Sequence, residues 1–231
     1  MPLRIDLNCD LGEGAGHDVE LMKLVTSANI ACGAHAGDEA TMRETVALAM
    51  KHGVAIGAHP GFADRENFGR RDLSLSAGEV EDLVAGQLVA LRAIASITHV
   101  KPHGALYNLA ACDAVVAGAI IEAIRAVDSG LVLFALQGSV LVRLGRERGL
   151  RVAEEVFADR TYRVDGSLTP RAEPGALITD EAECVAQALR LVTDGADTIC
   201  LHGDGPHAVA FARRLRDELE RTGVAVRAYG R

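Results

Sequence analysis

The sequence contains no tryptophan, and only 3% of its 231 residues are aromatic. The core therefore has to be built from alanine, valine, leucine and isoleucine. Hydrophobic residues make up 49% of the chain and its mean hydropathy is +0.15, which indicates a sizeable core. Small aliphatic side chains suit parallel strands that are covered by helices. The length is normal for one α/β barrel, so we expect a single domain over residues 1–231.

An excess of positive charge and long apolar runs are also missing. The formal net charge is −8, whereas a nucleic-acid-binding protein needs a basic surface. No apolar run approaches the roughly 18 residues that indicate a membrane-spanning helix. The N-terminus runs directly into Arg4-Ile5-Asp6-Leu7-Asn8, without the charged and apolar regions of a signal peptide. We therefore expect a cytoplasmic protein that binds neither nucleic acid nor membrane.

The five cysteines form no C-x-x-C pair and their number is odd, which argues against a disulfide framework. Cys9, Cys32 and Cys200 fall within predicted strands, where a cysteine usually serves as a small buried hydrophobic residue. A reactive thiol needs a neighbouring group that favours the thiolate. Only Cys9, next to Asp10, remains a candidate.

Apolar strand-like runs alternate with helical patterns along the whole chain. This alternation predicts a parallel sheet or barrel. The predicted strands span residues 3–9, 27–33, 53–58, 97–101, 131–136, 151–156, 197–201 and 224–228, and the helices span residues 17–25, 39–52, 77–95, 113–126, 139–148, 180–194 and 206–222. Two connections, 60–75 and 157–179, are unusually long, and we expect them to lie over the carboxyl ends of the strands.

Four short apolar runs end on a histidine beside a glycine or proline. These histidines are His35, His59, His103 and His202. In a barrel of alternating strands and helices, the active site lies where strands end and helices begin. A single such histidine is more often a hydrogen-bonded structural group than a catalyst. Four at matching positions predict one site that is assembled from distant parts of the chain.

The first strand places three polar side chains on one face, because side chains alternate along a strand. They are Asp6, Asn8 and Asp10. A polar face of this kind either lines a site or forms a hydrogen-bonded ladder within the sheet. Glu13 follows within a glycine-rich loop whose backbone N–H groups could approach a ligand. This loop is not a phosphate-binding P-loop, because no Gly-Lys-Ser/Thr follows it.

Charged residues near the other strand ends add candidates. Lys101 is one of only three lysines and precedes Pro102-His103, where it would either stabilise an anion or form an ordinary salt bridge. Asp204 lies two residues after His202 and could orient its ring. Arginines on the long loops suit a carboxylate or phosphate. Imidazoles with carboxylates also suit zinc, but no closely spaced histidine pair fixes such a geometry, so we assign no metal ligand and leave a catalytic metal open.

Long motifs in the sequence resemble the LamB/YcsF family of lactam utilisation proteins. They are DLNCDLGE (6–13), SANIACG (27–33), HAGD (35–38), GAHPG (57–61), FGRR (68–71), VKPHGALY (100–107) and FADR (157–160). The resemblance covers nearly the whole chain. It implies a distorted (β/α)7-type α/β barrel related to glycoside hydrolase and deacetylase barrels. One difference is Ala34, where family members usually carry a phenylalanine; this predicts either a larger pocket or a gap filled by another side chain.

The resemblance also implies a function. Family members act as the A subunit of the bacterial ATP-dependent 5-oxoprolinase, which converts 5-oxoproline, ATP and water to glutamate together with the B and C subunits. No nucleotide-binding motif occurs in this chain, so we expect the partner subunits to handle ATP as the co-substrate. A homo-oligomer also remains open.

Within that reaction, we expect Asp10, helped by His59 or His103, to activate water, and Lys101 to stabilise the developing charge. The residues expected to position the substrate are Asp6, Asn8, Glu13, His35, Arg70, Tyr107, Glu155, Arg160, His202 and Asp204.

Two alternatives stay open. The chain could be a stand-alone metal-dependent amidase or deacetylase on the same barrel. It could also be a non-catalytic subunit that holds the lactam for its partners. The number of ionisable groups at the strand ends exceeds what binding a small neutral ring requires, and this favours a catalytic role.

Overall fold

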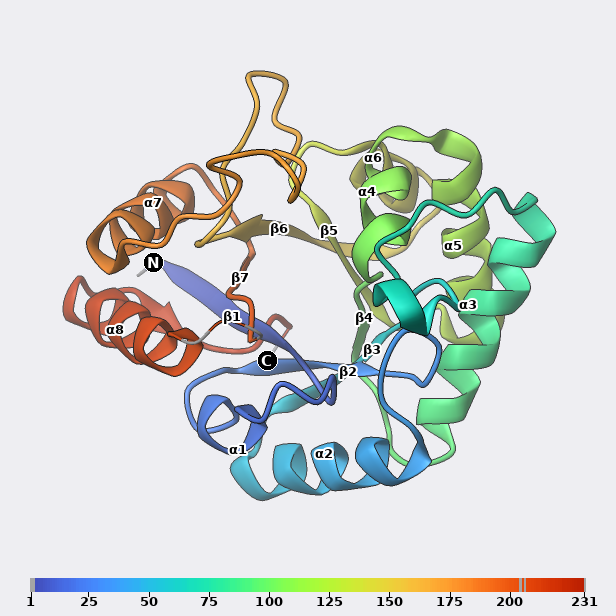
Figure 1. The fold of residues 1–231 in the computed structure, drawn as a ribbon, viewed down its shortest axis with the longest axis horizontal. Helices are drawn as coiled ribbons and strands as arrows, with labels where there is room; N and C mark the ends of the chain where they lie inside the picture. The colour runs from blue at the N-terminus through green and yellow to red at the C-terminus, as the bar shows by residue number, and fades with distance from the viewer. Residues whose placement is uncertain (1–2, 204, 206, 231) are drawn as a thin grey trace.

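Seven parallel strands form a closed barrel in the computed structural model, which describes residues 3–203, 205 and 207–230 (Figure 1). The strands are β1 (Arg4–Leu11), β2 (Ser27–Ala31), β3 (Ala55–His59), β4 (His99–Val100), β5 (Val132–Leu136), β6 (Arg151–Phe157) and β7 (Thr198–Cys200). Each strand pairs with the next, and β7 pairs with β1 to close the ring. A short eighth strand, β8 (Ala225–Val226), pairs with the start of β1. The predicted seven-stranded barrel is therefore confirmed.

Helices surround this barrel (Figure 1). They are α1 (Asp18–Leu21), α2 (Glu39–His52), α3 (Ala77–Arg92), α4 (Gly104–Cys112), α5 (Ala114–Asp128), α6 (Val140–Glu147), α7 (Glu181–Thr193) and α8 (Ala208–Arg221), with one 3-10 turn, η1 (Arg65–Asn67). Most ends follow from local sequence. The Asp38 side chain accepts a hydrogen bond from Thr41 N at the start of α2, and Ser76 forms a capping box with Glu79 at the start of α3.

Two helix predictions need correction. The helix expected over residues 17–25 is a single turn, Asp18–Leu21, because the chain must already enter β2 at Ser27. The helix α4 was not predicted, because it begins at Gly104 directly after His103, with no loop to separate it from the preceding strand end. The last helix was expected to open at Pro206, which lies outside the described residues; α8 is described from Ala208.

The outward faces of the strands form the main apolar core with the helices. In β1 the side chains of Ile5, Leu7 and Cys9 are each no more than 1% exposed and belong to this core. The alternate residues of the same strand point into the barrel, where the interior is polar. This division follows from the two-residue period of a strand.

A small residue in β3 makes room for a ring inside the barrel. His99 is 2% exposed, stacks on Phe134, and its Nε2 lies 3.0 Å from Asn29 Oδ1. A Cβ atom at Gly57 would overlap the His99 ring. A glycine is therefore required in β3 opposite His99.

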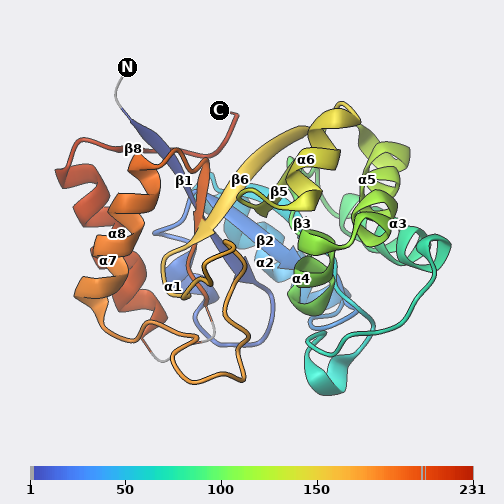
Figure 2. The ribbon, with the colours of Figure 1, turned by 90° about the horizontal axis from the view of Figure 1, so that it is seen from above.

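Within the described part of the chain, no helix has the length and apolar character needed to cross a bilayer. The two long connections, residues 60–75 and 157–179, lie at the same end of the barrel, which is at the bottom of Figure 2. That end carries the carboxyl termini of the strands.

The Gly57 contact gives a stability prediction. We expect Gly57→Ala to lower the free energy of unfolding by about 1–3 kcal/mol, because the buried His99 ring would have to move. Gly86→Ala is the matched control, since it lies in α3 with no atom within 4 Å of the added Cβ, and we expect it to raise stability by about 1 kcal/mol. Urea denaturation measures both. Equal stability of the two variants would contradict the steric argument.

Candidate functional site

A pocket of about 490 Å³ opens at the carboxyl ends of the strands. Nine of the residues predicted for the site line it, and they come from six separate segments of the chain. These residues are Asp10, Glu13, His59, Arg70, Lys101, His103, Tyr107, Arg160 and His202. The structure therefore brings most of the predicted site together. Ala34 is not among the lining residues.

Four predicted substrate-binding residues lie beneath or behind the pocket wall instead. They are Asp6, Asn8, His35 and Glu155, each at most 1% exposed and absent from the pocket lining. The structure therefore places these four side chains below the pocket surface, where other side chains cover them. Asp204 lies outside the described residues.

Asp6 and Asn8 belong to a hydrogen-bonded polar ladder inside the barrel. Asp6 accepts hydrogen bonds from the hydroxyls of Thr26, Ser27 and Thr198. Burial raises the pKa of the Asp6 carboxyl, although these hydroxyls oppose the shift. Asn8 Nδ2 donates to Glu155 and to Thr198. The ladder interpretation of this strand face is therefore correct below the pocket, and only Asp10 reaches the pocket itself.

Lys101 connects the ladder to the pocket. Its Nζ lies 2.9 Å from Asp10 Oδ1, 2.9 Å from Glu155 Oε1 and 2.9 Å from Cys200 Sγ. Burial lowers the pKa of the ammonium, but Asp10, Cys200 and Glu155 outweigh it and raise that pKa well above its usual range. Tyr107 Oη donates to the same Glu155 at 2.7 Å. Lys101 is thus a fixed positive charge in the pocket floor.

One nitrogen of the His59 ring faces one nitrogen of the His103 ring. When both rings are neutral, neither of these two nitrogens carries a proton. His59 Nδ1 lies 2.7 Å from the Lys101 carbonyl, and His103 Nε2 lies 2.9 Å from the Phe68 carbonyl. A carbonyl only accepts, so each of these nitrogens carries the ring proton. The remaining nitrogens, His59 Nε2 and His103 Nδ1, are 2.9 Å apart. Two lone pairs at this distance require a proton or another cation between them.

The charges around the pair favour a proton on His59. Burial lowers the pKa of His59, but the carboxylates of Asp10 and Glu13 outweigh it and raise that pKa. Burial together with His59 and His35 holds the pKa of His103 well below its usual range. Burial also lowers the pKa of His35, although its hydrogen bond to Glu13 opposes this. In the protein alone, these directions favour a proton that lies on His59 rather than on His103.

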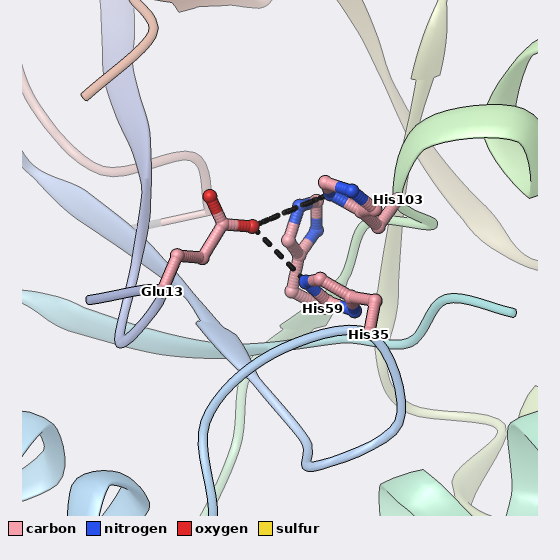
Figure 3. Close-up of side chains that lie close together, drawn as sticks. All are labelled: Glu13, His35, His59 and His103. Carbon is pink, nitrogen blue, oxygen red and sulfur yellow. Dashed lines mark hydrogen bonds and ion pairs between the residues drawn. The ribbon is translucent and has the colours of Figure 1, made fainter. Parts of the chain in front are cut away.

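Asp10 and Glu13 supply the compensating negative charge. His59 Nε2 lies 3.4 Å from Asp10 Oδ2, and Glu13 Oε1 lies 3.0 Å from His35 Nε2 and 3.3 Å from His103 Nδ1. Figure 3 shows the Glu13 carboxylate directed at the three rings. Burial alone raises the pKa of Asp10, but His59 and Lys101 outweigh it and hold that pKa well below its usual range. Asp10 is therefore ionised.

Four of these residues could hold a metal ion, since their ligand atoms all lie within 4.8 Å of one another. They are Glu13, His35, His59 and His103. The His35 and His103 rings are stacked, with centroids 3.8 Å apart and planes at 4°. An ion lies in the plane of each imidazole that ligates it, so two parallel rings cannot both bind one ion. The His59 and His103 rings are nearly perpendicular, at 87°, and these two could share an ion with Glu13.

His202 is oriented by a residue that sequence reasoning did not select. Its Nδ1 lies 2.9 Å from both carboxylate oxygens of Asp159, so Asp159 takes the role predicted for Asp204. Burial raises the pKa of Asp159, but His202 outweighs it and lowers that pKa. Asp159 belongs to the FADR motif (157–160), and this motif is the sequence signal that could have identified it.

The rim of the pocket is rich in guanidinium groups. The Arg70 guanidinium lies over the Phe68 ring, 4.9 Å from its centre. Arg160 is 5% exposed and donates to the carbonyls of Thr169 and Ala176 on the second long loop. Arg171, which the sequence patterns did not single out, also lines the pocket. The positive rim therefore faces a floor that carries Asp10 and Glu13.

The cysteine that lies close to the site is not the one that the sequence favoured. Cys9 faces the apolar core, and burial raises the pKa of its thiol well above its usual range. The thiol close to the site is Cys200, which shares a face of β7 with Thr198 and touches Lys101. Burial also raises the pKa of Cys200, so neither thiol is ionised. The period-2 pattern Thr198, Cys200, His202 was the signal that could have found it.

Known proteins with similar sequences and structures fit this geometry. Residues 5–231 match the LamB/YcsF family. The chain is 52% identical to the A subunit of 5-oxoprolinase from Bordetella parapertussis, with 97% of this chain and 98% of that protein covered. The crystal structure of the lactam utilization protein from Thermus thermophilus superposes with a TM-score of 0.91 at 46% identity, covering 98% of this chain and 100% of that one.

A polysaccharide deacetylase from Bacillus cereus has the same fold at 16% identity, with a TM-score of 0.54 over 99% of this chain and 92% of that one. This likeness confirms the predicted relation to deacetylase barrels. The match over nearly the whole chain and the identity above one half decide the family. The chain belongs to the LamB/YcsF family.

Proposed function

We propose that this chain is the A subunit of a 5-oxoprolinase and opens the ring of 5-oxo-L-proline to give L-glutamate in an ATP-coupled reaction. The relatives named as 5-oxoprolinase A subunits and the lactam utilization protein support this proposal. The observation that carries it is the 2.9 Å approach of His59 Nε2 to His103 Nδ1, with Asp10 Oδ2 3.4 Å from His59 Nε2. An acid and a carboxylate side by side are what hydrolysis of a cyclic amide requires.

In the proposed reaction, Asp10 orients the attacking water and accepts its proton. Water adds to the ring carbon that carries the phosphorylated oxygen, the ring C–N bond breaks, and the nitrogen leaves as an amine after it receives a proton. A second water then releases inorganic phosphate from the acyl phosphate that this step forms, which gives glutamate. His59 donates the proton to the nitrogen, because its pKa is raised and it lies 3.4 Å from Asp10. His103 orients His59. Lys101 stabilises the negative charge on the oxygens bound to the reacting carbon.

The low pKa of Asp10 makes it a weak base, which limits the substrate it can serve. Water that is activated by a weak base attacks an ordinary amide slowly. A weak base is sufficient when the carbonyl carbon has already been activated. Phosphorylation of the amide oxygen by ATP provides such activation. We therefore assign the ATP chemistry to the partner B and C subunits, and the ring opening to this chain.

The remaining residues divide into two groups under this proposal. Those that contact the substrate are Glu13, Arg70, Tyr107, Arg160 and His202, which line the pocket. Arg70 and Arg160 suit the carboxylate of 5-oxoproline or the phosphate of an activated form. Glu155, Asn8, Asp6 and His35 act from beneath as positioning residues. Location in the cytoplasm remains a prediction.

Reconstitution tests the central claim. We expect 5-oxoproline-dependent glutamate formation and ATP hydrolysis to be coupled only when this chain is added to the B and C subunits. Coupled assays for glutamate and for inorganic phosphate measure both products. Glutamate formation at the same rate without this chain would overturn the proposal.

Substitution of the acid and the carboxylate tests the site. We expect Asp10→Asn and His59→Gln each to lower kcat by about 10²–10⁴-fold, because each removes a group that moves a proton. His17→Gln is the control, since His17 lies outside the pocket and its side chain makes no capping hydrogen bond. Steady-state kinetics of the reconstituted complex gives the rates. Full activity of Asp10→Asn would instead support a non-catalytic, lactam-binding role.

One alternative has a structural basis, namely a stand-alone metal-dependent amidase that uses Glu13, His59 and His103. The parallel stacking of His35 on His103 disfavours a complete four-ligand site. We expect the reconstituted activity to survive dialysis against a chelator and to show no stimulation by added Zn²⁺ or Co²⁺. One tightly bound equivalent of metal, with amide hydrolysis in the absence of ATP, would establish the alternative.

A further inference from the structure

A second pocket, of about 410 Å³, lies away from the first, at the amino-terminal ends of β2 and β3. Its walls come from the segment after α1, the end of α2, one face of α8 and the segment after β8; Figure 1 shows α1, α2 and α8 on neighbouring sides of the barrel. None of the residues that line this second pocket lines the first one.

The second pocket is basic although the chain as a whole is acidic. Lys23, His52, Arg216 and Arg227 converge on it from four segments, and its lining includes no aspartate or glutamate. The formal net charge of the whole chain is −8, so a concentration of cations at one hollow is not a general property of its surface. Lys23, Arg216 and Arg227 place three positive charges around one cavity, and these charges repel each other unless negative charge lies among them.

Among these four side chains, only that of Arg216 forms hydrogen bonds within the described part of the protein. Arg216 Nη1 donates to the Leu24 carbonyl, and its Nε donates to Glu220. These bonds fix the Arg216 guanidinium at the wall. In contrast, the side chains of Lys23, His52 and Arg227 form no hydrogen bond or ion pair with any residue that the structure describes. Two full positive charges and one imidazole are therefore available to a ligand.

The remaining lining residues are Met22, Val25, Thr26, Gly53, Val54 and Ala228, and the side chains of Lys23 and Arg227 are exposed to solvent. A cavity of this volume falls within the range of small-molecule sites, which is about 300–1,000 Å³. Guanidinium and ammonium groups together match the several oxygens of a phosphoryl group. We propose that this pocket binds a phosphoryl anion, carried either by a small organic phosphate or by inorganic phosphate. This binding is separate from the ring-opening reaction and does not depend on the proposed function.

Isothermal titration calorimetry tests the site, with ADP and inorganic phosphate as the two probes in buffers of equal ionic strength. We expect saturable binding of at least one probe to the wild-type chain. The double variant Lys23→Gln/Arg227→Gln should weaken that binding by about tenfold or more, because it removes two charged hydrogen-bond donors. Tighter binding of ADP would identify an organic phosphate as the ligand, and equal binding of both probes would identify the phosphoryl group alone.

The matched control is Arg143→Gln/Arg190→Gln, which removes the same charge from α6 and α7, away from this pocket. It should bind as the wild type does, and thermal unfolding should show that both double variants are folded. Absence of saturable binding at millimolar probe overturns the proposal. So does an equal loss of affinity in both double variants, which would reflect net charge, or unchanged affinity in Lys23→Gln/Arg227→Gln, which would place the ligand elsewhere.

Discussion

The buried ammonium of Lys101 is the contact on which the site depends. It lies between Asp10 in the pocket floor and Glu155 in the interior ladder, so it joins two layers of the barrel. A buried charge is costly unless it is paired and hydrogen-bonded, and here two carboxylates and a thiol surround it. Glu155 in turn holds Asn8 and Tyr107. The position of Asp10 is thereby tied to strands on the opposite side of the ring.

This arrangement separates the groups that hold the site from those that form its wall. Asp6, Asn8 and Glu155 of the interior ladder do not line the pocket, whereas Asp10, on the same face of β1 as Asp6 and Asn8, does. On the other side, the carbonyls of Lys101 and Phe68 fix which nitrogen of each ring faces the pocket. The backbone therefore determines the proton positions of His59 and His103 before any substrate is present.

The sequence predicted those features of the fold and the site that depend on residues close together in the chain. The two-residue period placed Asp6, Asn8 and Asp10 on one face, and the strand-end pattern selected the histidines that meet in space. It could not reveal contacts between segments. The pairing of His202 with Asp159, 43 positions away, depends on the neighbouring ends of β6 and β7. Likewise, a short strand followed at once by a helix, as at His103, has no local boundary that would reveal α4.

Charge is graded along the pocket, and this bears on how a substrate lies in it. Arg70, Arg160 and Arg171 occupy the wall and rim, whereas Asp10 and Glu13 occupy the floor beside His59. An anionic substituent is attracted to the arginines, whereas Lys101 and His59 already compensate the floor carboxylates, so under the proposed function the substituent points outward. Under the proposed function, the bond to be broken is then directed toward the floor, where His59 lies beside the ionised Asp10. Under the proposed function, an activated, electron-poor carbonyl carbon is the kind of centre that an ionised Asp10 accommodates.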